Sequence, residues 1–158
     1  MSRRTTSHPA PLVQDTGVLD STPTLEVFGF GAVAAVGGTA VLPLRSDWLQ
    51  AREAGIPAVS GWSDLLNDDF SQVVVHLQKG RAATWQGLAE GWRRLTDGGR
   101  LLLVGGNQLG IKSAVKRLSD ELDQPAEILA NRARARVGSW RREGSVAPVQ
   151  TGRAPPEA

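Results

Sequence analysis

The sequence of 158 residues contains no cysteine, which excludes disulfide bonds, thiolate nucleophiles and cysteine-ligated metal sites. It has only two histidines, so it offers few ligands for zinc, and we expect no metal site. No apolar run approaches the roughly 20 residues that cross a bilayer. The basic amino-terminal stretch lacks the apolar core of a signal peptide. From these absences we expect a cytoplasmic protein that does not contact a membrane.

The residues that are present are typical of one globular domain. Apolar residues make up 41% of the chain and charged residues 22%. The net charge of +2 is too small to indicate a nucleic-acid-binding protein, so the placement of the arginines matters more than their number. Residues 1–22 and 145–158 have no periodicity and are rich in small, polar or proline residues. We expect them to be mobile tails around a single domain over residues 23–144.

The first half of this domain predicts short strands and one helix. The strands are expected at Leu25–Phe30, Ala40–Leu44 and Pro57–Gly61. A helix is expected between the second and third strands, with Ser46 as its N-cap and Gly55 as its terminator.

The second half has stronger patterns. The stretches "SQVVVHL" and "RLLLVGG" are apolar runs typical of buried strands. A helical spacing follows each run, and a tight turn is expected at the intervening "TDGG". The two helical sets are Trp85, Leu88, Ala89, Trp92 and Leu95, and Ile111, Ala114, Val115, Leu118 and Leu122. The closing pieces "EILANRA" and "RARVGSW" predict an antiparallel hairpin. Alternating strands and helices predict an α/β fold with a mostly parallel sheet.

The order of motifs in this half resembles a known family. The motifs are the Lys79-Gly80 turn, "L-x-x-GGRLLLVG" at Leu95–Gly105, "GIKSA" at Gly110–Ala114, and the closing "RARVGSW". Together they resemble the N-terminal domain of bacterial ribosomal RNA guanine-N2 methyltransferases, which belong to the class I S-adenosylmethionine (SAM)-dependent methyltransferases. The resemblance covers residues 70–142 well and residues 25–69 loosely. It implies a Rossmann-like methyltransferase fold whose sheet ends in an antiparallel hairpin.

In that family two methyltransferase-like domains follow one another. The C-terminal domain binds SAM and carries an Asn-Pro-Pro-aromatic motif, whereas the N-terminal domain has lost the cofactor site and supports folding and RNA binding. The present sequence has no Asn-Pro-Pro-aromatic motif and ends where the second domain would begin. The resemblance therefore implies no catalytic residue and no cofactor in this chain. It implies ribosomal RNA as a partner, together with a catalytic methyltransferase domain in cis or in trans.

The glycine-rich stretch "FGFGAV" is the candidate cofactor site. Gly29 and Gly31 have the spacing that lets a backbone approach a dinucleotide-like ligand, but a valine replaces the third small residue. Arg45, rather than an acid that could hold a ribose, follows the next predicted strand, and Asp47 lies two residues further on. A SAM pocket on Gly29 and Gly31 and a tight structural turn both remain open, and we favour the turn.

The strand tip at His76–Lys79 is the candidate catalytic edge. In amino-group methyltransferases this tip offers an Asn or Asp side chain and a prolyl carbonyl, which accept hydrogen bonds from the target amine. A lysine cannot accept such a bond, and no proline is present. His76 could act as a base, but no carboxylate is close in sequence, so we expect it to pack or to form a hydrogen bond. Lys79 is a candidate phosphate contact, with a solvated turn lysine as the alternative.

The stretch "GGNQLGIKSAVKR" is similar in spacing to a phosphate-binding loop (P-loop). Gly105 and Gly110 have the spacing of a P-loop, but Ile111 lies between Gly110 and Lys112. This extra residue disfavours a nucleoside triphosphatase. A capped helix entry explains the glycines better. Lys112 remains a candidate RNA contact.

Arginines accumulate near the end of the predicted domain. No acid occurs between Ile128 and Arg142. Arg132, Arg134 and Arg136 alternate, so within one strand they would point to one face and form a row suited to backbone phosphates. A solvated strand edge is the alternative. We count these three arginines and Arg141 as RNA-contact candidates.

The tryptophans are expected to serve mainly in the core. Trp85 and Trp92 lie on an apolar helix face and are assigned to the core. A base-stacking role is considered for Trp140.

The favoured function is a degenerate methyltransferase-like domain that acts as a scaffold and RNA-binding module. Two alternatives stay open: an active minimal SAM-dependent methyltransferase, and a ligand-free protein-interaction domain. Binding of SAM would favour the first alternative, and binding of neither RNA nor SAM would favour the second.

Overall fold

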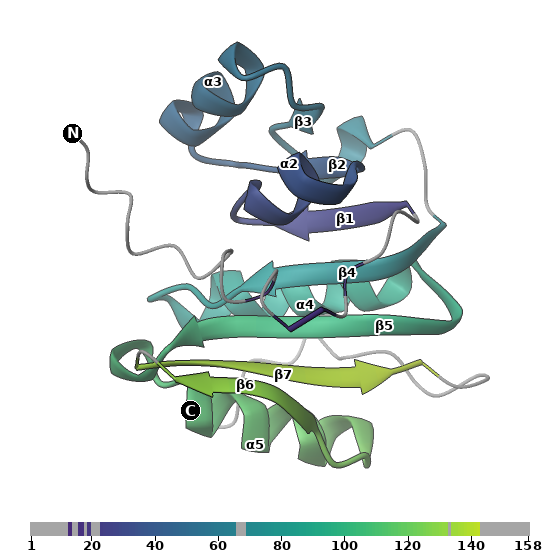
Figure 1. Ribbon diagram of the computed structural model, residues 1–158, viewed down its shortest axis with the longest axis vertical. Coiled ribbons are helices and arrows are strands. Elements are labelled where there is room, and N and C mark those ends of the chain that lie inside the picture. Colours follow the sequence, from purple (N-terminus) through teal and green to yellow (C-terminus); the bar gives the residue numbers. More distant parts are fainter. Residues whose placement is uncertain are drawn as a thin grey trace.

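The computed structural model describes residues 13, 16, 17, 19, 23–65, 69–132 and 134–142. Within these residues seven strands form one sheet in the order β3-β2-β1-β4-β5-β7-β6 (Figure 1). The strands are β1 Thr24–Val27, β2 Thr39–Val41, β3 Ala58–Val59, β4 Phe70–His76, β5 Leu95–Gly106, β6 Glu127–Arg132 and β7 Ala135–Arg141. The helices are α2 Gly31–Val36, α3 Arg45–Glu53, α4 Arg81–Arg93 and α5 Ile111–Leu122, with short 3-10 turns η2 Trp62–Asp64 and η3 Asn107–Leu109.

The sheet is parallel from β3 to β5 and antiparallel in the β6–β7 hairpin. This arrangement confirms the expected Rossmann-like α/β fold with a carboxyl-terminal hairpin. Val27 of β1 lies beside Val75, and His76 lies beside Val104 of β5. The carboxyl ends of β1, β4 and β5 therefore meet at one edge, which we call the carboxyl edge. The turn between β6 and β7 lies at the same edge, because Ala135 pairs with Gly106.

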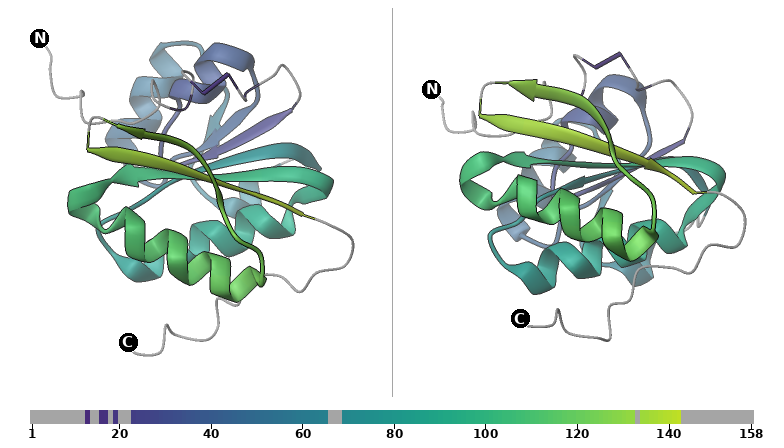
Figure 2. Two further views of the ribbon diagram at one scale, coloured as in Figure 1. Left: turned by 60° about the horizontal axis from the view of Figure 1, so that its bottom comes forward. Right: turned by 90° about the horizontal axis from the view of Figure 1, so that it is seen from below.

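Helices cover the two faces of the sheet separately. α4 and α5 pack on one face, and α2 lies on the other (Figure 2). Trp85 and Trp92 of α4 are buried, which confirms that they belong to the core. Val13 is also fully buried, and it packs with Val74 on the α2 face. The packed unit thus includes a residue of the segment expected to be a tail. The other residues of the two expected tails lie mostly outside the described part of the chain.

Two local expectations differ from the structure. α3 begins at Arg45 with Leu44 as its N-cap, so Ser46 is inside the first turn and does not cap the helix. The segment Thr96–Gly99 belongs to β5 and does not form a separate turn. The pairing between β4 and β5 shifts register at this point, and Gly98 has a φ of +82°. The glycine thus allows an irregular stretch of strand.

None of the described helices is long and apolar enough to cross a membrane. Within the same residues, no group of three histidine or carboxylate side chains is arranged to hold a metal ion.

Candidate functional site

A buried histidine–glutamate pair lies at the point where the order of the strands reverses. The chain runs outward from β1 through β2 and β3, and then from β4 through β5, so the crevice between β1 and β4 is the switch point where open α/β sheets bind ligands. Here Nε2 of His76 lies 2.6 Å from Oε2 of Glu26. The other carboxylate oxygen accepts a hydrogen bond of 2.8 Å from the backbone N–H of Val33 in α2. Glu26 is 0% exposed and His76 3% exposed, so both side chains are enclosed.

The glycine loop after β1 packs directly on this pair. A Cβ atom on Gly29 would lie 2.6 Å from both Cδ2 and Nε2 of His76, so only glycine fits beside the imidazole ring. Phe28 has a φ of +69°, and its ring packs against Gly87 of α4. Gly31 is the first residue of α2. The loop is therefore a tight turn with protein side chains packed on both sides of it.

A cavity of about 430 Å³ is the second feature of the carboxyl edge. It lies between the loop that follows β4 and the loop that follows β5, on the face covered by α4 and α5. Three cations line it: Lys79 from the first loop, Arg81 at the start of α4, and Arg117 from α5. The guanidinium of Arg117 lies over the ring of Trp85, 4.9 Å from its centroid. The other lining residues are Leu77, Gln78, Thr84, Leu109, Gly110, Ser113 and Ala114. None of the described residues that line the cavity is an acid.

Three segments that are distant in sequence meet at this edge and give it a positive charge. They are residues 77–84 after β4, residues 105–114 after β5, and residues 131–136 at the hairpin turn, and none of them contains an acid. The hairpin turn is joined to the β5–α5 loop, because Asn107 N–H donates a hydrogen bond of 2.7 Å to the carbonyl of Arg134. The six cations of these segments are Lys79, Arg81, Lys112, Arg132, Arg134 and Arg136. We call them the basic edge.

At the opposite end of α4 the cations are compensated. Glu90 accepts hydrogen bonds from Arg93 at 2.7 Å and from Arg94. Partial burial raises the pKa of Glu90, but the hydrogen bonds and positive charges of Arg93 and Arg94 outweigh burial and hold this pKa below its ordinary value. The basic edge has no such partners for Lys79 and Arg81 among the residues that the structure describes.

The expected arginine row is not present. Arg132 lies opposite Ala135, and Asn131 lies opposite Arg136. Because paired residues share a face and successive residues alternate, Arg132 and Arg136 point to opposite faces of the sheet. Arg134 lies in the turn with a φ of +61°. The expectation of a row was wrong because it placed the three arginines in one strand, whereas the chain reverses between them.

Two more candidates lie away from the basic edge. Arg141 is opposite Arg100, roughly 17 Å along β7 from Arg136, and its Nη1 donates a hydrogen bond of 2.8 Å to the carbonyl of Gly98. Trp140 is 1% exposed, and its Nε1 donates a hydrogen bond to Ser119, so it cannot stack on a base. The role considered for Trp140 was therefore wrong.

The sequence also left important residues unassigned. Glu26, Arg81 and Arg117 were not singled out, although Glu26 is the one charged residue in its predicted strand. Its partner His76 is distant in sequence, and only the pairing of β1 with β4 brings the two together. The expectation that His76 forms a hydrogen bond is confirmed.

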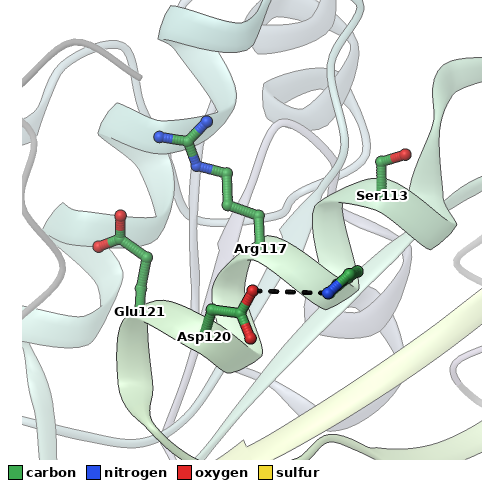
Figure 3. A pocket seen from close by; sticks show the side chains of 5 residues that line it. Ser113, Arg117, Asp120 and Glu121 are labelled. Atoms are coloured by element: carbon green, nitrogen blue, oxygen red, sulfur yellow. Dashed lines mark ion pairs between the residues drawn. The ribbon is translucent and has the colours of Figure 1, made fainter. Parts of the chain in front are cut away.

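A groove on α5 is a separate feature. It has a volume of about 500 Å³ and is formed by one helix face, where Lys116 pairs with Asp120 at 3.8 Å (Figure 3). Arg117 extends from this face toward the neighbouring helix (Figure 3). The groove contains no strand-end residue and carries both charge signs, so we assign no function to it.

Comparison with known proteins identifies the fold. No protein-family model matches the chain, and no curated protein matches it in sequence. Among solved structures, the 16S rRNA N2 G1207 methyltransferase RsmC of T. thermophilus, in complex with AdoMet and guanosine, aligns with a TM-score of 0.75 at 20% identity. The alignment covers 93% of this chain and 42% of that chain.

Two further structures align with lower TM-scores. TrmN from Thermus thermophilus aligns with a TM-score of 0.59 at 15% identity, over 84% of this chain and 47% of that chain. An rRNA methylase from Streptococcus thermophilus aligns with a TM-score of 0.59 at 17% identity, over 91% of this chain and 99% of that chain. The chain thus spans less than half the length of RsmC and of TrmN. These alignments and the strand order show that the chain has the Rossmann-like fold of class I SAM-dependent methyltransferases.

Proposed function

We propose that this chain is a methyltransferase-fold domain that binds RNA through its basic edge and does not itself transfer methyl groups. The observation that carries the proposal is the basic edge, where three distant segments bring together six cations and no acid. Phosphate backbones bind to such surfaces through electrostatic attraction and counterion release, without a need for base contacts. The placement of the charge supports RNA binding although the net charge of the chain is small.

The residues around the glycine loop do not fit SAM. Oε1 of Glu26 accepts a hydrogen bond from the N–H of Val33, and Oε2 contacts His76. Both carboxylate oxygens therefore already have partners within the protein. The His76 ring fills the space beside Gly29, where the backbone would have to approach the cofactor. After β2 the chain continues through Leu42, Pro43 and Leu44 to Arg45, and its first acid, Asp47, lies within α3 rather than at the strand end. These contacts support a structural role for Gly29 and Gly31.

The strand tip after β4 has neither the Asn or Asp side chain nor the proline that amino-group methyltransferases use there. Gln78 is the one amide there, and its Nε2 donates hydrogen bonds to the carbonyls of His76 and Leu77, which directs the amide toward the protein backbone. Lys79 is a donor only. We therefore assign no catalytic residue to the chain.

Ribosomal RNA is the RNA that we propose. RsmC and the streptococcal methylase are described as acting on rRNA, and the motifs of the second half resemble ribosomal RNA guanine-N2 methyltransferases. Because this chain spans 42% of RsmC, we further propose that it works beside a catalytic methyltransferase domain, in cis or in trans. In that arrangement the chain supplies RNA affinity and a scaffold, and the partner domain supplies the cofactor and the reaction.

Calorimetry tests the cofactor part of the proposal directly. Titration of the chain with SAM and with S-adenosylhomocysteine should give no binding heat, while a ribosomal RNA fragment should bind in a filter assay. Micromolar binding of SAM would overturn the proposal in favour of a minimal methyltransferase, whose supporting observation is the shared fold. Binding of neither ligand would favour a protein-interaction domain.

A further inference from the structure

The cavity between the β4–α4 and β5–α5 loops combines charge with an apolar wall. Lys79 and Arg81, both exposed, line it with positive charge, while Leu77 and Trp85 provide apolar surface. Trp85 is 7% exposed and therefore held in place by the core. Leu109, at 40% exposure, extends the apolar surface toward solvent. Binding of a phosphate backbone requires positive charge but no apolar surface, so the apolar wall indicates a ligand that also has an apolar part.

Two of the nearby cations, Arg81 and Lys112, lie at the amino ends of helices, where positive charge lowers helix stability. The amino end of a helix carries partial positive charge, which favours acids there. Arg81 is the first residue of α4 and Lys112 the second of α5, and neither helix has an acid in its first turn. α3 also opens with an arginine, Arg45, but has Asp47 in the same turn. An anion in the cavity, next to Arg81, would relieve this repulsion at the amino end of α4.

Arg117 supplies a flat surface beside these charges. Its guanidinium is held over the Trp85 ring at 4.9 Å, and no carboxylate among the described residues pairs with it. Stacking on an aromatic ring orders the guanidinium plane and leaves its N–H groups free to donate. Nucleobases that are not paired in a helix stack on such planes and on aromatic rings.

The volume of the cavity sets the size of the ligand. About 430 Å³ lies within the usual range for small-molecule sites and is enough for one nucleotide. We propose that this cavity binds one unpaired nucleotide of an RNA strand, with the phosphate between Lys79 and Arg81 and the base against Arg117 and Leu109. The inference rests on the proposed function, because RNA is the ligand in both. It adds that the protein distinguishes unpaired from paired RNA, since a base within a duplex cannot enter a cavity.

The test compares two RNA probes on the native chain and its variants. A labelled single-stranded oligouridylate and a labelled RNA duplex of equal length are titrated by fluorescence anisotropy. Arg117→Lys keeps the charge and removes the guanidinium plane, so it should weaken oligouridylate binding about tenfold and leave duplex binding within about twofold. Lys116→Arg is the matched control, because Lys116 precedes Arg117, lies outside the cavity and pairs with Asp120. It should change neither affinity.

The possible outcomes separate this inference from the proposed function. Equal losses of oligouridylate and duplex binding in Arg117→Lys would overturn the nucleotide cavity and leave a general phosphate surface. Duplex binding by the native chain without oligouridylate binding would also overturn the cavity, while the proposed function would stand. Binding of neither probe would overturn both. Circular dichroism of each variant confirms folding, and a shift of the Trp85 indole resonance on adding uridine 5′-monophosphate would place the ligand in the cavity.

Discussion

Replacing Arg81 by glutamate should stabilise the fold and weaken RNA binding. Arg81 is exposed and opens α4, a helix of 13 residues with no acid in its first turn and no side-chain cap. A charge at a helix terminus changes stability by about 0.3–1 kcal/mol. Arg81→Glu removes an unfavourable charge and adds a favourable one, so we expect a gain of about 1 kcal/mol in the free energy of unfolding. For a domain of this size the gain raises Tm by about 2–6 °C.

The same substitution should reduce RNA affinity at least about tenfold and lower the salt slope of binding by about one. Urea denaturation measures the first effect, and anisotropy over a salt series measures the second. Arg45→Glu is the matched control, because Arg45 opens α3, is also exposed, and does not line the cavity. It should leave RNA binding unchanged. A loss of stability in Arg81→Glu, or an unchanged RNA affinity, would refute the reasoning.

Three further predictions concern the packed interior and the ion pairs. His76→Ala leaves the buried Glu26 side chain without its imidazole partner, so urea denaturation should show a loss of about 1–3 kcal/mol; an unchanged free energy of unfolding would contradict the buried pair. Gly29→Ala should cost about 1–3 kcal/mol, because the new Cβ meets the His76 ring, and it should cost less when His76 is already alanine. Because the pKa of Glu90 is lowered in the folded state, this carboxylate stabilises the fold above pH 4.5, and its contribution is lost as pH falls through the folded pKa. Glu90→Gln should therefore flatten the acidic part of the curve of unfolding free energy against pH. An unchanged curve would contradict the pairing of Glu90 with Arg93 and Arg94.

The patterned segments of the sequence predict much of the fold. The apolar runs of β4 and β5 and the helical spacing of α4 and α5 are strong because these elements form the centre of the core. The hairpin of β6 and β7 is predicted as well, since its two strands are adjacent in the sequence. The start of α3 is less well predicted, because no side chain caps it and only the local backbone decides where it begins.

The candidate site is predicted only in part. Lys79 is identified because it follows a clear strand, and the structure places it in the cavity. Arg117 is not identified, because a helical arginine carries no local signal until α4 brings Trp85 beneath it. The partner of His76 is missed for the same reason, since a parallel pairing across many residues brings Glu26 to it. The arginines near the hairpin were assigned to one face because the alternation expected within one strand was applied across the reversal between β6 and β7.

The measurement that tests the central claim most directly is the affinity of the native chain for a ribosomal RNA fragment over a series of salt concentrations. If the basic edge binds phosphates, the logarithm of the affinity falls linearly with the logarithm of the salt concentration, and the slope is shallower when Lys79, Arg81 and Arg134 are replaced by alanine. If the native chain does not bind RNA, or if the triple variant binds with the same affinity and the same slope, the claim is contradicted.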